Sequence, residues 1–284
     1  MAVFFGFETA TLENSHLHLE YLTEAGPRIV HLSLGDSREN ILGEFPDVEW
    51  PVPSGRYQLL GGHRLWAAPE IPGVSYAPDS AGLQITEAEG GLDLTWEPRQ
   101  QGLAKSIRVT LVADRPAVRL VHTITNRFEH GLQLAPWGIT VLPLGGRAYL
   151  PSAGEGNGLH PDRHLVLWPY ARWDDPRIAL MTAGITVAGK AGSPPLKVGA
   201  FVDSGVCAYL RSGILMVIRF AVQEGDYPDR QCNVEAYCSD RYLELETLGT
   251  LADLAPGESA SFEETWEIYA GAEAKSQLSE IFPH

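Results

Sequence analysis

Residues 106–125 read SIRVTLVADRPAVRLVHTIT, and this stretch decides the fold that the sequence predicts. Apolar and polar residues alternate on both sides of Asp114-Arg115-Pro116, with the period of two that is typical of half-buried β-strands. One face of the second strand carries Val118, Leu120, His122 and Ile124. On such an apolar face we interpret His122 as a core histidine bonded to a neighbour. The stretch predicts two antiparallel strands joined by a turn.

The same pattern recurs along most of the chain. Tight-turn residues separate further alternating segments at Gly90-Gly91, Ser212-Gly213, Ser239-Asp240 and Ala255-Pro256-Gly257-Glu258. Helical periodicity is confined to a short stretch at 272–281, and the chain lacks the alternation of strands and helices that parallel sheets require. We therefore expect an all-β protein, a large antiparallel β-sandwich that forms a single domain over residues 1–284 and ends in a short helix.

Composition and charge exclude several classes of partner. The chain has 36 Asp and Glu against 21 Lys and Arg, a formal net charge of -15, which repels nucleic acids and anionic lipid surfaces. Its longest apolar run, 214–218, is far below the roughly 18 residues that span a bilayer. The first residues lack the basic leader of a signal peptide, so we expect a cytoplasmic protein with three reduced cysteines. We expect no partner among nucleic acids or membranes.

The segment Gly61-Gly62-His63-Arg64-Leu65-Trp66-Ala67-Ala68-Pro69-Glu70 combines an imidazole, a guanidinium, an indole and a carboxylate. The Arg64 guanidinium is a planar group that can bind two oxygens at once, and the Trp66 indole suits the C–H face of a sugar ring. A loop in which His63 and Arg64 bond to backbone carbonyls explains the same residues. The segment is a candidate binding site, and both interpretations remain open.

Acidic residues gather near the C-terminus. In 242–247, YLELET, the leucines face one side of a strand and Glu244 and Glu246 the other. Glu235 and Tyr237 lie on the polar face of the preceding strand, after a polar run that contains Tyr227 and Asp229. These glutamates either face solvent or form the floor of a cleft. Their spacing matches no calcium loop, so we predict neither a metal site nor a cofactor.

Residues 145–193 are rich in glycine, proline, histidine and tryptophan and lack clear alternation, which predicts loops that surround a site. Within them, 167–177 reads LWPYARWDDPR and places Trp168 and Arg172 beside further aromatic and acidic residues. Aromatic rings next to such charges suit polyhydroxylated ligands, although a loop anchored on the sandwich by its tryptophans would look the same.

Taken together, these segments resemble the galactose-mutarotase-like superfamily, the supersandwich fold of aldose 1-epimerases, and within it an uncharacterised branch. The resemblance rests on 25–29 (AGPRI), 62–70 (GHRLWAAPE), 123–126 (TITN), 227–229 (YPD), 243–249 (LELETLG) and 254–258 (LAPGE). It implies a small-molecule carbohydrate as the ligand.

The resemblance also implies roles for individual residues. In the epimerases a glutamate takes the proton of the anomeric hydroxyl, and a histidine protonates the ring oxygen. Glu246 matches the glutamate, but Trp137 occupies the place of the histidine, which leaves His63 as the candidate acid. Candidate substrate-binding residues are Arg64, Trp66, Trp137, Trp168, Arg172, Tyr227, Asp229 and Glu235.

Three functions stay open at this point. An aldose 1-epimerase-like isomerase would use Glu246 and His63, a non-catalytic sugar-binding module would use the same cleft without turnover, and a purely structural sandwich would bind no small ligand. The sequence does not predict the oligomeric state.

Overall fold

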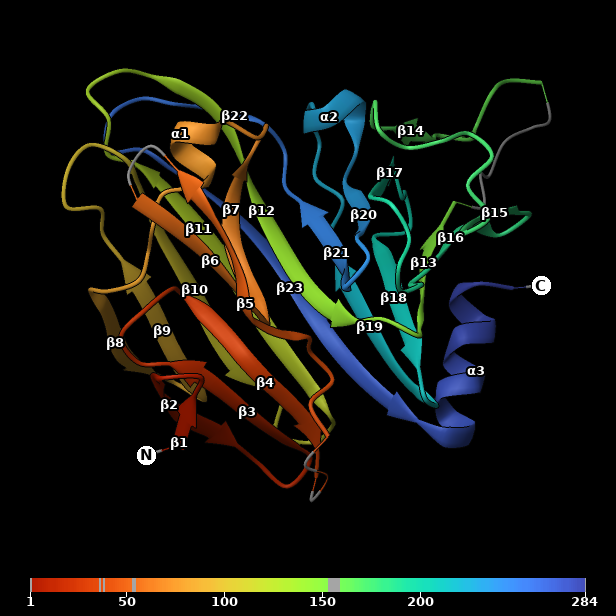
Figure 1. The fold of residues 1–284 in the computed structure, drawn as a ribbon, viewed down its shortest axis with the longest axis horizontal. Coiled ribbons are helices and arrows are strands. Elements are labelled where there is room, and N and C mark those ends of the chain that lie inside the picture. Colours follow the sequence, from red (N-terminus) through yellow and green to blue (C-terminus); the bar gives the residue numbers. More distant parts are fainter. Residues whose placement is uncertain (1, 36, 38, 53–54, 153–158, 284) are drawn as a thin grey trace.

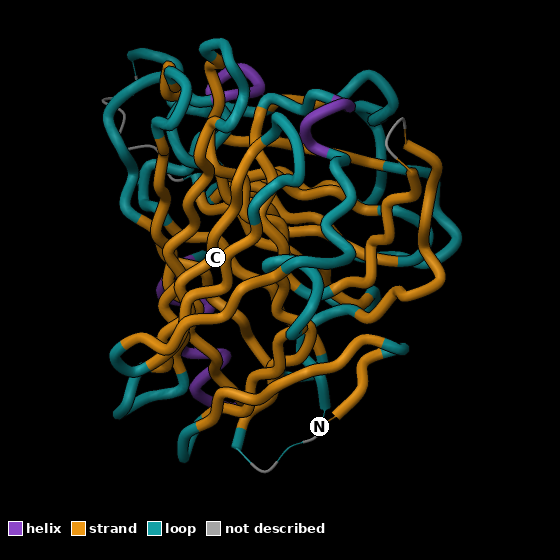
Figure 2. Tube along the Cα trace, turned by 90° about the vertical axis from the view of Figure 1, so that its left-hand side faces the viewer, coloured by secondary structure: helices purple, strands orange, loops and turns teal. Residues whose placement is uncertain are grey.

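The computed structural model describes residues 2–35, 37, 39–52, 55–152 and 159–283. Two large antiparallel sheets lie face to face, as the sequence predicted (Figure 1). Turned by 90°, the molecule shows strands through most of its volume, with the helices as short segments at the margins (Figure 2).

The first sheet contains eleven strands within the described residues. Ten of them follow one another in space as β1 (Ala2–Phe4), β2 (Phe7–Glu13), β3 (Leu17–Leu22), β4 (Arg28–Leu34), β7 (His63–Ala68), β12 (Leu132–Pro143), β21 (Tyr242–Leu248), β20 (Val234–Cys238), β17 (Leu196–Ala200) and β14 (Val166–Leu167). The remaining strand, β22 (Ala252–Leu254), pairs with β12.

The second sheet contains ten strands within the same residues. Their order is β15 (Ile178–Met181), β16 (Gly184–Ala188), β13 (Arg147–Pro151), β18 (Val206–Arg211), β19 (Ile214–Phe220), β23 (Ser259–Ala270), β11 (Ala117–Asn126), β10 (Leu103–Leu111), β9 (Gly91–Trp96) and β8 (Leu83–Ala88). A separate hairpin is formed by β5 (Glu44–Val52) and β6 (Gly55–Gly61).

The hairpin predicted from 106–125 is present as β10 and β11. Their register places Ile107 opposite His122 and Val109 opposite Leu120. The side chains predicted to share a face, at 118, 120, 122 and 124, are all buried. This face contributes to the main apolar core, which lies between the two sheets. The expectation for 145–193 needs correction, because this region forms β13 to β16 as well as loops.

Helices are short and peripheral. Helix α3 (Gly271–Ile281) covers the outer face of β18 and β19, where Ala274 packs on Val206 and Leu215. The sequence predicted this helix over 272–281. The other two helices of the described residues, α1 (Pro72–Ser75) and α2 (Pro228–Gln231), are single turns in connections between the two sheets. Within the described residues, no helix has the length and apolar character needed to cross a membrane.

Candidate functional site

The outer face of the first sheet carries the candidate site, and strand alternation builds it. In β7 (His63–Ala68), Arg64 and Trp66 point outward, whereas Leu65 between them points into the core. Strand register then aligns side chains across the sheet. Ile139 of β12 lies opposite Arg64 on one side and Glu246 on the other, and Glu246 lies opposite Glu235 of β20.

These side chains surround a cavity of about 760 Å³. Its floor consists of buried strand residues, namely Arg64, Trp66, Trp137, Ile139, Lys197, Glu244 and Glu246. Its rim consists of more exposed residues, namely Trp50, Glu70, Tyr76, Trp168, Tyr170, Pro195, Tyr237 and Tyr242. A polar and charged floor beneath an aromatic rim is typical of sites for small molecules that carry both hydroxyls and apolar faces.

Lys197 forms one side of the cavity floor. Its Nζ lies 2.9 Å from Oε2 of Glu246 and 2.6 Å from Oε2 of Glu235. The same oxygen of Glu246 accepts a hydrogen bond from Trp137 Nε1 at 2.8 Å. The ammonium also sits against two indoles, 4.6 Å from the ring centroid of Trp137 and 4.7 Å from that of Trp168.

Burial determines the charge state of this cluster. It opposes the charge of Lys197, but the adjacent Glu235 and Glu246 carboxylates raise the lysine pKa well above its ordinary value. For Glu235, burial raises the pKa well above its ordinary value, and Lys197 offsets this only in part. Neither oxygen of Glu235 accepts a hydrogen bond of good geometry. We therefore describe the cluster as one lysine, Lys197, shared by two buried carboxyl groups, of which Glu235 has its pKa raised by burial.

Arg64 forms the other side of the cavity floor. Its Nη2 donates to Oε1 of Glu244 at 2.8 Å, and its guanidinium lies 4.5 Å from the ring centroid of Trp66. Burial raises the pKa of Glu244, and the neighbouring Arg64 opposes this effect. The Nε and Nη1 groups of Arg64 are buried without hydrogen-bond partners among the described residues, which is costly for a charged donor.

Five of the residues proposed from sequence meet in this cavity: Arg64, Trp66, Trp137, Trp168 and Glu246. Trp66 and Trp137 also contact each other edge to face, with ring centroids 5.6 Å apart. Distant segments of the chain therefore converge on this cavity.

His63 does not line the cavity. It is adjacent to Arg64 in a strand, so its side chain points to the opposite face, into the core between the sheets. There its Nδ1 lies 3.0 Å from Thr140 Oγ1, and its Nε2 lies 2.7 Å from Nε2 of His122. His63 is completely buried. The structure thus separates His63 from Glu246, which lines the cavity on the other face of the sheet.

His63, His122 and Glu264 form an interior cluster whose ligand atoms lie within 4.8 Å of one another. Burial lowers the pKa of His63 well below its ordinary value, lowers that of His122 to about 4, and raises that of Glu264 to about 7. The Nε2–Nε2 distance of 2.7 Å fits an N–H···N hydrogen bond. It is shorter than the roughly 3.3 Å between two ligands of tetrahedral zinc. We interpret the cluster as a hydrogen-bonded network.

The other predicted binding residues lie elsewhere. Arg172 is exposed and paired with Asp174. Tyr227 is buried, and its hydroxyl donates to the carbonyl of Gln223. Asp229 lies in α2 with a φ of 50°. None of these three residues lines the cavity.

Glu235 occupies an intermediate position. It is fully buried beside the floor and contacts Lys197, but its side chain is not part of the cavity wall. Its contact with the cavity floor is made through Lys197.

Sequence reasoning missed Lys197, which is the central cation of the site. It occurs in LKVGA, residues 196–200, and its neighbours have the apolar pattern of a buried strand. A single lysine inside such a strand was the available signal, because a lysine is rarely buried unless it is paired. The rim tyrosines at 76, 170, 237 and 242 were also missed as ligand-binding candidates, since they come from four separate segments.

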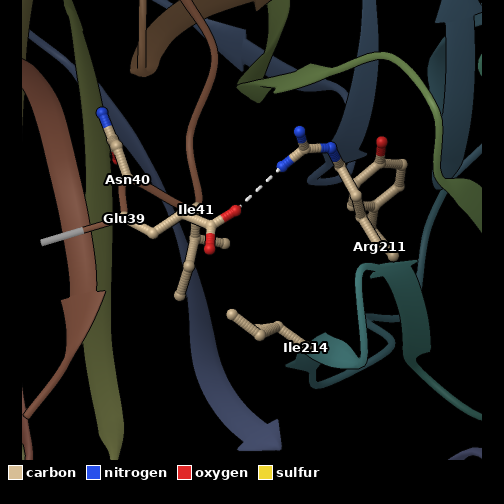
Figure 3. A pocket seen from close by; sticks show the side chains of 6 residues that line it. Glu39, Asn40, Ile41, Arg211 and Ile214 are labelled. Atoms are coloured by element: carbon tan, nitrogen blue, oxygen red, sulfur yellow. Dashed lines mark hydrogen bonds and ion pairs between the residues drawn. The ribbon is translucent and has the colours of Figure 1, made fainter. Parts of the chain in front are cut away.

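A second hollow, shown in Figure 3, is too small to be a comparable site. Glu39 and Arg211 face each other across it, with 3.4 Å between Oε1 and Nη1. Its volume is about 10 Å³, which is room for about one water molecule.

Comparison with solved structures finds the same fold at low sequence identity. A TPR-domain containing protein from Parabacteroides distasonis ATCC 8503 matches 92% of this chain with a TM-score of 0.65 and 13% identity. The match covers 47% of that protein, so this chain spans about half of its length. A galactose mutarotase related enzyme from Lactobacillus acidophilus matches over 93% of this chain and 98% of its own, with a TM-score of 0.53 and 9% identity.

These matches confirm the predicted resemblance at the level of the fold, which is that of galactose-mutarotase-like proteins. No protein-family model and no curated protein matches the chain.

Proposed function

We propose that this protein binds a carbohydrate in the cavity on the outer face of the first sheet. One observation carries the proposal: three indoles, of Trp66, Trp137 and Trp168, and two carboxylate–cation pairs meet in a single cavity. Aromatic faces cover the C–H faces of sugar rings, and hydroxyls can both donate to carboxylates and accept from cations. The name of the Lactobacillus acidophilus match, a galactose mutarotase related enzyme, supports the same ligand class.

The charges of the cavity favour an uncharged carbohydrate. Both cations that line it are already paired, Arg64 with Glu244 and Lys197 with Glu246. The remaining lining carboxylate, Glu70, makes the described wall net negative. A phosphate or carboxylate on the ligand would lie close to the carboxylates of Glu70, Glu244 and Glu246, and this proximity of like charges is unfavourable. Neutral hydroxyls can join the existing pairs without separating them.

Mutarotation is the second candidate function, and one contact favours it. Lys197 Nζ lies 2.9 Å from Oε2 of Glu246, whereas Oε1 of Glu246 has no hydrogen-bond partner among the described residues. In this scheme Oε1 takes the proton of the anomeric hydroxyl, and Lys197 gives a proton to the ring oxygen. The bond between C1 and the ring oxygen breaks, the aldehyde forms, and reclosure on the other face returns both protons.

Binding without turnover remains the first candidate, because the pKa of Lys197, the proton donor of this scheme, is poorly suited to general-acid catalysis. The carboxylates around Lys197 raise its pKa well above its ordinary value, whereas an efficient general acid has a pKa near the working pH.

Calorimetric titration with glucose, galactose and glucose 6-phosphate tests the binding proposal. We expect the neutral sugars to bind, Trp168→Ala to weaken that binding at least tenfold, and glucose 6-phosphate to bind more weakly than glucose. Trp173→Ala is the matched control, because Trp173 belongs to the same loop but is 85% exposed and lies outside the cavity wall. Equal affinity for Trp168→Ala and the unmodified protein would contradict the proposal.

Polarimetry on freshly dissolved α-anomers tests mutarotation. If the protein catalyses mutarotation, the rate with protein exceeds the spontaneous rate in buffer. We expect Glu246→Gln and Lys197→Met to abolish this excess and Glu263→Gln to retain it. Glu263 is an exposed carboxylate that pairs with Arg119 on the second sheet. A rate equal to that of buffer would remove the catalytic candidate and leave the binding proposal intact.

A further inference from the structure

The cavity floor contains the same arrangement twice. At one centre, the Arg64 cation pairs with Glu244 and lies on the Trp66 ring. At the other, the Lys197 cation pairs with Glu246 and lies between two indoles. Each centre therefore offers a carboxylate acceptor, a cationic donor and an aromatic face, which are the groups that one sugar ring needs.

The two centres are adjacent but distinct. Glu244 and Glu246 point to the same face of β21 and are two residues apart, which separates their backbones by about 7 Å. Their cationic partners reach them from opposite sides, Arg64 from β7 and Lys197 from β17. The axes of these two strands are four inter-strand spacings apart in the sheet, roughly 19 Å, and the side chains of Arg64 and Lys197 extend from them toward β21. The floor therefore offers two neighbouring sets of polar contacts.

The rim extends along both centres. Trp50 and Tyr76 lie beside Trp66, and the ring centroids of Tyr76 and Trp66 are 4.9 Å apart. Beyond the second centre, Trp168 and Tyr170 form the wall. Aromatic cover is thus available over each centre. The cavity volume of about 760 Å³ falls in the upper part of the range for sites that hold drug-sized ligands, which are larger than one sugar.

We infer that the cavity binds an uncharged carbohydrate of at least two sugar units, with one unit at the Arg64–Glu244 centre and the next at the Lys197–Glu246 centre. This inference rests on the proposed function and adds the size of the ligand to it. A monosaccharide fills one centre and leaves the other to water. A disaccharide contacts both and gains affinity from the second set of contacts.

Calorimetric titration with monosaccharides and their disaccharides tests the inference. The probes are glucose, galactose and xylose against cellobiose, maltose, lactose and xylobiose. We expect the best disaccharide to bind at least tenfold more tightly than any of the monosaccharides. We expect Glu244→Gln and Glu246→Gln each to reduce disaccharide affinity to about that of a monosaccharide. Glu263→Gln, a carboxylate-to-amide change on the other sheet, should leave both affinities unchanged.

The outcomes separate the inference from the function on which it rests. If monosaccharides bind and no disaccharide binds more tightly, the two-unit inference is wrong and carbohydrate binding stands. If no sugar of either size binds, both fall. If disaccharide affinity falls in only one of the two glutamine variants, and both variants have the thermal stability of the parent, a single centre binds the ligand and the inference is overturned.

Discussion

His63 and Arg64 are neighbours in the chain, yet their side chains lie on opposite faces of the first sheet. Arg64 pairs with Glu244 at the floor of the cavity, whereas His63 bonds to Thr140 and His122 between the sheets. Of these two neighbours, only Arg64 lies at the cavity where we propose that the ligand binds, and His63 belongs to the interior of the sandwich.

The interior position of His63 predicts the effect of His63→Ala. The change removes two buried hydrogen-bonding contacts and leaves a small cavity, so the free energy of unfolding should fall by about 2 kcal/mol. Carbohydrate affinity should stay within twofold of the parent, because His63 does not reach the cavity. Urea denaturation and calorimetric titration measure the two effects. A large loss of affinity with unchanged stability would place His63 at the ligand instead.

Removal of the Lys197 ammonium should destabilise the fold. Lys197→Met keeps the aliphatic stem but leaves the Glu246 carboxylate buried without its cation. Breaking such a pair typically costs about 3 kcal/mol or more. Lys275→Met is the matched control, since Lys275 is exposed on α3. Equal unfolding free energies for the two variants would show that the pair contributes nothing to stability.

The Arg64–Glu244 pair should behave as a coupled unit. Arg64→Met and Glu244→Met each leave one buried group without its partner, and each should cost about 3 kcal/mol. The double variant should cost less than the sum by about 1 to 3 kcal/mol, because it leaves neither charge alone. Denaturant unfolding of all four proteins gives this coupling energy. Additive costs would contradict the pairing.

The interior cluster predicts a pH dependence. Burial raises the pKa of Glu264 from 4.5 to about 7, so the folded state holds a proton that the unfolded state releases between these values. The contribution of Glu264 is therefore largest below pH 4.5 and is lost as the pH rises to about 7. Glu264→Gln removes this titration.

We expect the stability of the parent, relative to Glu264→Gln, to fall by about 3 kcal/mol from pH 4.5 to 7. Burial lowers the pKa of His122 to about 4, so His122 gives the free energy of unfolding the opposite pH dependence. This contribution is present in both proteins and cancels when their free energies of unfolding are subtracted. Unfolding curves at several pH values provide the measurement. A difference that is the same at every pH would contradict the raised pKa of Glu264.

Strand alternation made the fold predictable and also explains the errors at the site. The same period of two that predicted the β10–β11 hairpin places the His63 and Arg64 side chains on opposite faces of their strand. The candidate site nevertheless included both residues, because their side chains suit the same chemistry and they are adjacent in the sequence. Arg172 was predicted from the residue types around it and Tyr227 from the motif at 227–229, but their exposure or burial depends on loop geometry that no local pattern encodes. Lys197 could have been found, because a lysine in an apolar strand needs a buried partner.

The tryptophans provide the most direct test of carbohydrate binding in the cavity. Of the seven in the chain, Trp50, Trp66, Trp137 and Trp168 line the cavity, whereas Trp96, Trp173 and Trp266 do not. Indole N–H resonances in a ¹H–¹⁵N spectrum report on each ring during titration with cellobiose, maltose and lactose. If carbohydrate binds in the cavity, the indole resonances of the four cavity tryptophans shift and those of the other three do not. Shifts confined to the exposed Trp173, or no shift with any of these sugars, would contradict it.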